Sequence, residues 1–532
     1  MNMTSKETIV QGKAVLGIEL GSTRIKAVLT DEGGKPLAQG SHTWENQLVD
    51  GLWTYSIDDV WTGLQHCYAD LRENVRKEYD TEIESLAAIG ISAMMHGYMP
   101  FGDSEEILVP FRTWRNTNTA AAAAELSELF HYNIPLRWSI SHIYQAILNE
   151  EPHVKDIKFF TTLAGYVHWM LTGEKVLGIG DASGMLPVDT ETKDYSQEMI
   201  DKFDSLVADR GFQWKLRDIL PKVLLAGELG GRLTEEGARR LDVSGHLKAG
   251  IPFCPPEGDA GTGMVATNAV KQRTGNVSAG TSSFSMIVLE KDLSQPYEVI
   301  DMVTTPDGSL VAMVHCNNCT SDINAWTSIF REYQEMMGMD VNMGEIYDRL
   351  FTKALEGDAD CGGLISYNYV SGEPVTGLAE GRPLFVRSQK DKFNLANFVR
   401  AQLYASVGVL KIGNDILFNK EHVAVDRITG HGGLFKTPGV GQRILAAALN
   451  TPISVMSTAG EGGAWGIALL AGYVVNNPKR MSLADYLEQV IFEGSTGSSV
   501  DPDPEDVAGF EKYIEDYKRG LAIEKCAVEN KN

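Results

Sequence analysis

Several features that would assign a protein to a common class are absent from this 532-residue sequence. There is no excess of basic residues: the formal net charge is −24, which argues against a nucleic-acid partner, because nucleic-acid binding needs a basic face. There is no GxxxxGK[ST] phosphate-binding loop and no zinc-finger or basic-zipper pattern. Small anionic ligands stay compatible with this charge, because local backbone dipoles can hold them within an acidic protein.

Long apolar runs and frequent cysteines are also missing. No apolar run reaches membrane-spanning length, and the N-terminal MNMTSKETIVQGK lacks the apolar stretch of a signal peptide. The six cysteines are sparse and irregularly spaced. We therefore expect a cytoplasmic protein without a membrane partner. Cys316 and Cys319 form a CxxC, but no second pair accompanies them, which favours a structural role over metal or redox chemistry.

The length predicts more than one domain, because single cores rarely serve more than about 200 residues. Residues 14–31 read as a β-hairpin whose turn is Gly21-Ser22-Thr23, and residues 273–290 read as a second hairpin whose turn is Gly280-Thr281-Ser282. A similar hairpin thus opens each half of the chain. We predict an N-terminal domain over residues 14–264, a C-terminal domain over 265–480, and an acidic helical extension over 481–532.

Further elements follow from residue periodicity and composition. We expect a third strand at 37–46, an amphipathic helix at 60–79, a buried strand at 86–93 and a helix at 121–130. A strand at 422–430 leads into a glycine turn and then a helix at 440–449. The small residues of 457–472 open another helix and would allow close approach of either a flat ring or a second helix.

Two kinds of glycine-rich segment suggest nucleotide chemistry. Successive N–H groups in the tight turns at 21–23 and 280–282 can form anion-binding nests, and the hydroxyl groups of these turns add donors. Small polar residues are also ordinary in hairpin turns, so either turn alone would favour the simpler interpretation. Gly432 and Gly433 stand between a strand and a helix, a geometry suited to a nucleotide.

Three other residues are candidates for a substrate site. Asp259 lies among glycines in PEGDAGTG and could accept a hydroxyl proton, or could cap the helix that follows. His96 follows a buried strand, at the end where open α/β sheets bind ligands, although a lone histidine there is more often structural. Trp114, in the polar stretch FRTWRNTNT, could line a polyol site or belong to the core.

Taken in order, these segments resemble the FGGY family of carbohydrate kinases. The resemblance rests on GIELGSTRIKA, PEGDAGTG, GNVSAGTSSF and TGHGGLFKTP, and on a longer segment over residues 371–411. The MMHG at 94–97 is similar to the sugar-site segment of xylulose kinases. The family's fold implies an α/β architecture of two RNase H-like domains, of the actin/hexokinase/Hsp70 superfamily, with an interdomain cleft.

The resemblance implies an ATP:sugar phosphotransferase that uses Mg²⁺. It implies that Asp259 is the general base and that Met95, His96 and Gly97 contact the sugar, with Trp114 nearby. Residues implied to hold phosphates or adenosine are Gly21, Ser22, Thr23, Lys26, Gly280, Thr281, Ser282, Gly432 and Gly433. The substrate is expected to be a ketose or polyol, with a ketopentose such as xylulose or ribulose favoured, and a homodimer is the ordinary expectation for such a chain.

The sequence departs from the family pattern in three places. Glu19 stands where an aspartate normally helps to hold the metal, and Mg²⁺ demands near-ideal octahedral geometry. Asn116 and Asn118 replace an acidic residue and an arginine, and the stretch HCNNCTSDINAW at 315–326 has no assigned role. These departures motivate an alternative, a non-catalytic sugar- or nucleotide-binding relative. An actin-like ATPase with a protein partner is a third hypothesis.

Overall fold

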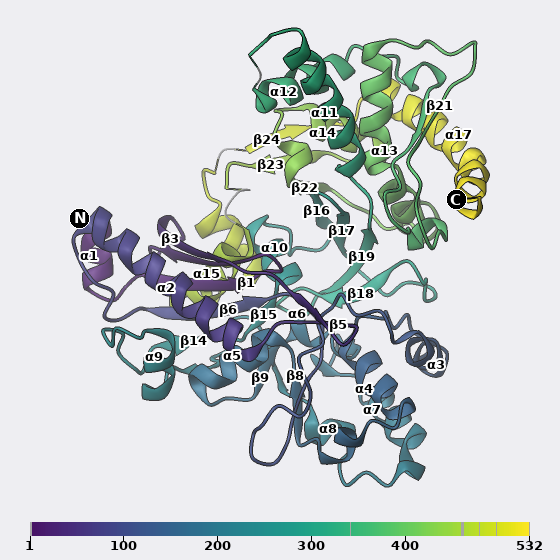
Figure 1. The fold of residues 1–532 in the computed structure, drawn as a ribbon. Helices are drawn as coiled ribbons and strands as arrows, with labels where there is room; N and C mark the ends of the chain where they lie inside the picture. The colour runs from purple at the N-terminus through teal and green to yellow at the C-terminus, as the bar shows by residue number, and fades with distance from the viewer. Residues whose placement is uncertain (1–2, 341, 459–461, 478, 496, 531–532) are drawn as a thin grey trace. The chain divides into compact units, whose positions relative to one another are not determined.

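The protein is a mixed α/β molecule with two seven-stranded sheets (Figure 1), in agreement with the predicted fold class. The structure, a computed structural model, describes residues 3–340, 342–458, 462–477, 479–495 and 497–530. The chain divides into two compact units that interleave in sequence. Unit 1 comprises Met1–Val270, Gln295–Val311 and Glu461–Gly494, and unit 2 comprises Lys271–Ser294, Ala312–Gly460 and Ser495–Asn532. The consecutive segments 14–264, 265–480 and 481–532 stay a prediction.

The sheet of unit 1 combines a hairpin with parallel strands. Its order is β13-β14-β6-β1-β2-β3, and β15 also pairs with β6. The strands are β1 (Val15–Leu20), β2 (Arg24–Thr30), β3 (Pro36–Thr43), β6 (Ala88–Ala93), β13 (Gly231–Arg232), β14 (Pro252–Phe253) and β15 (Glu257–Gly258). Antiparallel pairing joins β1 to β2 and β2 to β3, whereas β1, β14 and β15 each run parallel to β6. The predicted hairpin at 14–31 and the strands at 37–46 and 86–93 are confirmed.

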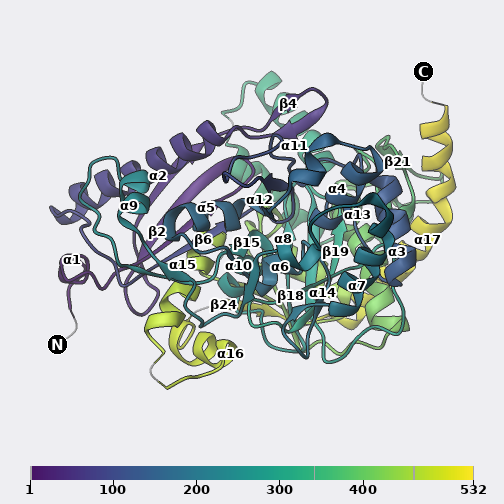
Figure 2. The same cartoon turned by 90° about the horizontal axis from the view of Figure 1, so that it is seen from below.

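A long amphipathic helix covers this sheet. Helix α2 (Ile57–Tyr79) begins after Ser56, whose side chain accepts a hydrogen bond from the Asp59 N–H at 3.0 Å, and ends at Asp80 in the left-handed conformation. Its buried face carries the predicted residues Val60, Leu64, Cys67, Tyr68 and Leu71. Both views show α2 beside the strands of unit 1 (Figures 1 and 2).

Glycines allow helix α15 (Gly462–Val475) to lie directly on the same sheet. A Cβ atom on Gly17 would come within 2.1 Å of the Ala464 carbonyl oxygen, and one on Gly466 within 2.0 Å of the Thr262 carbonyl oxygen. Thr262 belongs to helix α10 (Asp259–Ala266), so α15 packs on both β1 and α10. The small residues near 457–472 therefore serve helix packing. The part of that stretch at 459–461 lies outside the described residues.

The sheet of unit 2 repeats the hairpin and parallel-strand plan. Its order is β18-β19-β17-β16-β22-β23-β24, with β16 antiparallel to β17 and parallel to β22. The strands are β16 (Thr274–Ala279), β17 (Ser283–Val288), β18 (Asp301–Thr304), β19 (Leu310–Cys316), β22 (Arg427–His431), β23 (Ile453–Met456) and β24 (Gly497–Val500). The hairpin predicted at 273–290 is confirmed.

One predicted strand begins later than expected. The sequence predicts a strand from residue 422, but β22 starts at Arg427. The preceding helical segment ends at Lys420, and residues 422–426 form a loop whose Val423 N–H donates back to the Leu417 carbonyl at 2.9 Å. The helices predicted at 121–130 and 440–449 are confirmed as α3 (Ala120–Phe130) and α14 (Val440–Leu449).

The remaining elements connect and cover the sheets. The further helices are α1 (Ser5–Val10), α4 (Ser139–Leu148), α5 (Leu163–Thr172), α6 (Ile179–Ala182), α7 (Gln197–Leu206), α8 (Leu216–Ile219), α9 (Glu235–Leu241), α11 (Ser321–Met336), α12 (Met343–Ala354), α13 (Leu395–Asp415), α16 (Leu483–Tyr486) and α17 (Pro504–Glu529). The short strand pairs are formed by β4 (Gln47–Val49), β5 (Leu52–Thr54), β7 (Met99–Phe101), β8 (Phe159–Thr161), β9 (Val176–Gly178), β10 (Val188–Asp189), β11 (Asp194–Tyr195), β12 (Lys222–Leu224), β20 (Ile365–Tyr367) and β21 (Leu384–Val386). Within the described ranges, every helix is too short or too polar to span a lipid bilayer.

A buried ion cluster anchors the C-terminal helix α17, yellow in Figure 1, to unit 2. Asp506 lies in its first turn and is buried. One carboxylate oxygen accepts from Arg400 of α13 at 2.5 Å, and the other accepts from Arg443 of α14. The side chain of Arg400 is only 2% exposed, so its charge depends on Asp506 for compensation.

Replacing Asp506 by Ala is expected to lower the free energy of unfolding by about 3–5 kcal/mol, because the Arg400 charge would stay buried without its partner. Urea unfolding measures the effect. Asp516→Ala in the same helix is the matched control, because its partner Arg519 is exposed and the loss should stay below about 1 kcal/mol. Equal losses in the two variants would contradict the anchoring role.

Candidate functional site

Three parallel strands of unit 1 deliver three predicted site segments to one edge of the sheet. Strands β1 and β15 both run parallel to β6, so their carboxyl ends lie at the same edge. The turn 21–23 follows β1, the segment 94–97 follows β6, and Asp259 follows β15. The structure therefore brings together the predicted base, the predicted sugar segment and the first glycine turn.

Asp259 is the first residue of α10, directly after the last residue of β15. It is not the N-cap residue of this helix, because the N-cap position is Gly258. The Met95 N–H donates to Asp259 Oδ1 at 3.2 Å, which joins the carboxylate to the predicted sugar segment. Burial raises the pKa of Asp259 to about 6, against the hydrogen bonds from the Met95 and Ala260 N–H groups. This carboxylate is ionised at neutral pH and basic enough to accept a proton.

Two fully buried carboxyl groups, those of Asp181 and Glu257, lie close to Asp259 and were absent from the sequence-based predictions. Glu257 accepts from the Asp181 N–H at 2.9 Å and from the Gly180 N–H at 3.3 Å, which fixes α6 against β15. Burial, followed by the charge of Asp181, raises the pKa of Glu257 to about 8. Burial, with the nearby charge of Asp259, raises the pKa of Asp181 to about 7. The sequence holds at most an indirect signal, the glycine at position 178, where the structure shows that a Cβ atom would come within 2.2 Å of Glu257 Oε1.

Glu19 lies near Asp259 in a row of polar residues across the sheet. The register aligns Lys26, Glu19, Ser92 and Glu257 on strands β2, β1, β6 and β15. Burial, followed by the charge of Asp259, raises the pKa of Glu19 to about 7, whereas the Ala464 N–H and Lys26 lower it. A Cβ atom on Gly463 would be 2.3 Å from Glu19 Oε1, so this carboxylate needs a glycine at the start of α15.

The Glu19 carboxylate could bind Mg²⁺ together with water molecules and the phosphate groups of a substrate. Mg²⁺ usually keeps several waters and is held by one or two carboxylates together with substrate phosphates. Glu19 is a half-buried residue whose carboxylate lies near the charge of Asp259, which suits that mode. Among the described residues no group of three or more His, Cys, Asp or Glu could hold a metal, so a cage made by protein alone does not fit.

The segment 94–97 holds a constrained histidine. His96 and Gly97 both have positive φ values, 67° and 89°. His96 is 5% exposed, and its Nδ1 lies 3.0 Å from the Gly184 carbonyl oxygen. The Ser139 hydroxyl donates to the Gly97 carbonyl at 2.6 Å. These contacts hold the segment rigidly beside Asp259, as a substrate-positioning role would require.

Trp114, Asn116 and Asn118, all from the stretch 111–119, lie in three different environments. Trp114 Nε1 donates to Ser22 Oγ at 3.2 Å, which places Trp114 beside the first glycine turn as well as against the core. Asn116 is buried and exchanges hydrogen bonds of 2.8 and 2.9 Å with the main chain of Trp53. Asn116 therefore has a structural role in this chain, whereas Asn118 is exposed.

Unit 2 brings its own predicted residues to one sheet edge. The turn 280–282 follows β16, and Gly432 and Gly433 directly follow β22, which runs parallel to β16. Gly432 has a φ of 102°, and a Cβ atom on it would be 2.6 Å from the Ala279 carbonyl oxygen. Around Gly433 nothing lies within 4 Å of such an atom, so its surface is open.

The two cysteines of the CxxC are buried thiols. Burial raises the pKa of Cys319 to about 12 and holds that of Cys316 well above its usual range. A protonated thiol is neither a good nucleophile nor a metal ligand, which agrees with the structural role favoured by the sequence.

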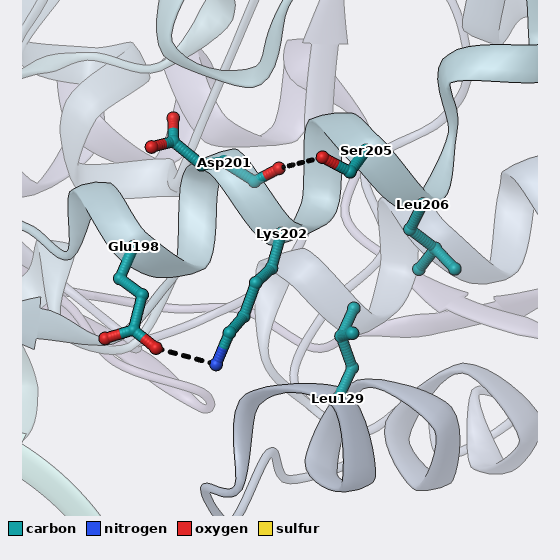
Figure 3. Close-up of a pocket in the computed structure, with 6 residues that line it drawn as sticks. All are labelled: Leu129, Glu198, Asp201, Lys202, Ser205 and Leu206. Atoms are coloured by element: carbon teal, nitrogen blue, oxygen red, sulfur yellow. Dashed lines mark hydrogen bonds and ion pairs between the residues drawn. The ribbon is translucent and has the colours of Figure 1, made fainter.

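A surface pocket elsewhere in unit 1 is separate from these residues. Leu129, Glu198, Asp201, Lys202, Ser205 and Leu206 line it, between α3 and α7 (Figure 3). Lys202 pairs with Glu198 at 2.7 Å, and Ser205 Oγ donates to the Asp201 carbonyl at 2.8 Å. Its lining shares no residue with the three strand ends of unit 1.

Comparison with known proteins relates the chain to sugar kinases. The family model of the N-terminal domain of FGGY carbohydrate kinases matches residues 14–266, and the C-terminal model matches 275–475. A xylulose kinase from Lactococcus lactis subsp. lactis is 22% identical over 526 residues, which cover 95% of this chain and 96% of the relative.

Solved structures share the fold. A ligand-bound xylulose kinase from Lactobacillus acidophilus superposes with a TM-score of 0.77 and 17% identity, over 97% of this chain and 99% of that one. A gluconate kinase from the same organism gives a TM-score of 0.77 and 17% identity, over 96% and 98%. The predicted two-domain actin/hexokinase-like fold is confirmed.

The Asp259 carboxyl is expected to titrate near pH 6, because burial disfavours its charged form. Infrared difference titration of the wild type against Asp259→Asn measures this transition. The variant should lose it and should also titrate Glu19 at lower pH, because the charge of Asp259 raises the pKa of Glu19. Asp58→Asn is the control, since it removes an exposed first-turn carboxylate of α2. If the signal that Asp259→Asn removes titrated near pH 4 instead, the assignment would be contradicted.

Proposed function

The chain belongs to the FGGY family of carbohydrate kinases, and from this premise we propose that it phosphorylates a primary hydroxyl group of a ketose or polyol. ATP is the phosphoryl donor. A ketopentose such as xylulose or ribulose is the favoured acceptor, supported by the MMHG segment at 94–97 and by relatives that are named xylulose kinase.

The observation that carries this proposal is the environment of Asp259. Asp259 is a half-buried residue at the carboxyl end of β15, and its carboxylate is oriented by the Met95 N–H. A pKa of about 6 lets Asp259 stay ionised at neutral pH and still accept a proton as the reaction proceeds. The adjacent residues Met95, His96 and Gly97 would contact the sugar, and their main-chain bonds would hold it near the base.

The proposed step is a direct phosphoryl transfer. Asp259 accepts the proton of the sugar hydroxyl while that oxygen forms a bond to the γ-phosphorus of ATP. The bond between the γ-phosphorus and the bridging oxygen breaks, and the electron pair leaves with ADP. The raised pKa values of Asp181 and Glu257 favour their neutral forms, which limits the negative charge behind the base.

The remaining residues would bind the nucleotide. Gly21, Ser22, Thr23, Gly280, Thr281 and Ser282 would offer main-chain N–H groups and hydroxyl groups to phosphate oxygens. Gly432 and Gly433 would border the adenosine. When bound, Mg²⁺ neutralises phosphate charge, and Glu19 would be its protein ligand, with Lys26 as a nearby cation.

The alternative of a non-catalytic binding protein has lost part of its motivation. Asn116 is a structural residue, so its difference from the family pattern carries no information about lost activity. Glu19 keeps an oxygen ligand beside Asp259. An actin-like ATPase would hydrolyse ATP without any dependence on sugar.

Release of ADP by the purified protein with Mg²⁺ and ATP, against a panel of ketoses, aldoses and polyols, tests the proposal. One or two ketopentoses should stimulate turnover, and Asp259→Asn should lower kcat at least about 100-fold, because general base catalysis contributes about 10²–10⁴-fold. Asp58→Asn should retain full activity. If no sugar raises ADP release above background, the binding-protein alternative is favoured, and sugar-independent hydrolysis would identify an ATPase.

Gly280→Val tests the second turn. A Cβ atom on Gly280 meets no atom closer than 4.0 Å, so the variant should fold normally. Its side chain would instead occupy the space of an approaching phosphate, and ATP affinity should fall about 100-fold through the loss of charge-assisted hydrogen bonds. Calorimetric titration with ATP measures this change.

Gly33→Val is the matched control for that experiment, because Gly33 lies in another exposed hairpin turn of the chain. Its ATP affinity should equal that of the wild type. Unchanged ATP affinity in a folded Gly280→Val protein would remove the turn from the nucleotide site.

A further inference from the structure

Hydrogen bonds from buried side chains hold the carbonyl groups of the first glycine turn. The Gly21 carbonyl accepts from Trp44 Nε1 at 2.7 Å, and the Ser22 carbonyl accepts from the Tyr55 hydroxyl at 2.6 Å. The two donors are 7% and 2% exposed, and their rings stack with centroids 4.2 Å apart. Two buried, stacked aromatic side chains thus hold the first two carbonyl groups of the turn.

The second glycine turn has the same arrangement with different donors. The Gly280 carbonyl accepts from the Thr320 N–H at 3.0 Å and from Thr320 Oγ1 at 2.8 Å. The Thr281 carbonyl accepts from the Cys319 N–H at 2.9 Å. In both turns, donors from elsewhere in the same unit hold the first two carbonyl groups.

A polar network holds residues 317–320, which support the second turn. The Glu373 carboxylate accepts from the Asn317 N–H at 2.9 Å and from Asn318 Nδ2 at 3.0 Å. Asn368 Nδ2 donates to the Cys319 carbonyl at 2.9 Å. The stretch HCNNCTSDINAW thus acquires a role through its asparagines and main chain, in addition to the buried cysteines.

The hydrogen bonds to the carbonyl groups of the two turns also fix the direction of the neighbouring N–H groups. A trans peptide is planar, so its N–H points away from its C=O, and fixing the carbonyl fixes the N–H of the next residue. The Ser22 and Thr23 N–H groups therefore face away from Trp44 and Tyr55, and those of Thr281 and Ser282 face away from Thr320 and Cys319. No hydrogen bond within the described part of the chain uses these four N–H groups, and Thr23 and Thr281 are exposed.

We propose that Tyr55 and Thr320 are positioning residues that preorganise the two turns for the phosphate groups of the nucleotide. The inference rests on the proposed function, because it takes ATP as the ligand. Tyr55 and Thr320 touch neither phosphate nor sugar in this proposal. They act by keeping pairs of successive N–H groups aimed outward, so that binding costs little rearrangement.

Tyr55→Phe and Thr320→Val each remove one hydroxyl donor and retain most of the packing. Each should weaken ATP and inorganic tripolyphosphate about three- to tenfold, the worth of one hydrogen bond. Adenosine affinity and the KM for the sugar should not change, and kcat should change less than the KM for ATP. Thr320→Ser should restore wild-type ATP affinity. Competition binding and steady-state kinetics measure these quantities.

Two variants serve as matched controls, because each also removes one hydroxyl bond to a carbonyl. Tyr79 donates to the Leu37 carbonyl at 2.8 Å in unit 1, and Thr327 donates to the Ile323 carbonyl at 2.8 Å in α11. Tyr79→Phe and Thr327→Val should leave tripolyphosphate affinity unchanged.

The outcomes separate this inference from the proposed function. If wild-type protein binds ATP and both test variants bind it equally well, the positioning role is wrong and the kinase proposal stands. Equal losses for adenosine and tripolyphosphate, or losses in the two controls, would show general destabilisation and would also overturn the role. If wild-type protein binds neither ATP nor tripolyphosphate, the proposed function itself fails.

Discussion

The parallel pairing of β1 and β15 with β6 is the constraint on which the candidate site of unit 1 depends. It gathers the ends of three strands from distant parts of the sequence at one edge of a rigid sheet. Rigid strands hold functional groups more accurately than free loops do. The glycine turn, the segment 94–97 and Asp259 acquire their proximity from this pairing alone.

Burial raises the pKa values of the four carboxyl groups at and around the candidate site. Glu19, Asp181, Glu257 and Asp259 all have raised pKa values, with desolvation as the largest cause in each case. Ordinary carboxyl groups in water would be fully ionised at neutral pH and poor proton acceptors. Grouping four of them in one unit costs stability, since charged groups resist burial and repel one another. Clusters of titratable groups with shifted pKa values are typical of functional sites.

The two glycine turns show one physical solution reached with different residues. Unit 1 uses the side chains of Trp44 and Tyr55, whereas unit 2 uses the main chain and hydroxyl group of residues 319 and 320. In each case the donor lies behind the turn and the N–H groups face outward. In the proposed function, this common geometry would let an acidic protein bind a polyanion without a dense patch of lysines and arginines.

The sequence by itself determined the local elements and the chemistry-bearing segments. Alternating apolar residues and turn glycines are local signals, so both hairpins and helix α2 could be predicted, and the surrounding glycines singled out Asp259 as a candidate. Tertiary structure alone decided that Glu257 meets Asp181, 76 residues away, and that Tyr55 holds Ser22, 33 residues away. It also gave Asn116 a structural role. These contacts depend on strand order and helix packing, which bring together residues whose neighbours in sequence carry no sign of the partner.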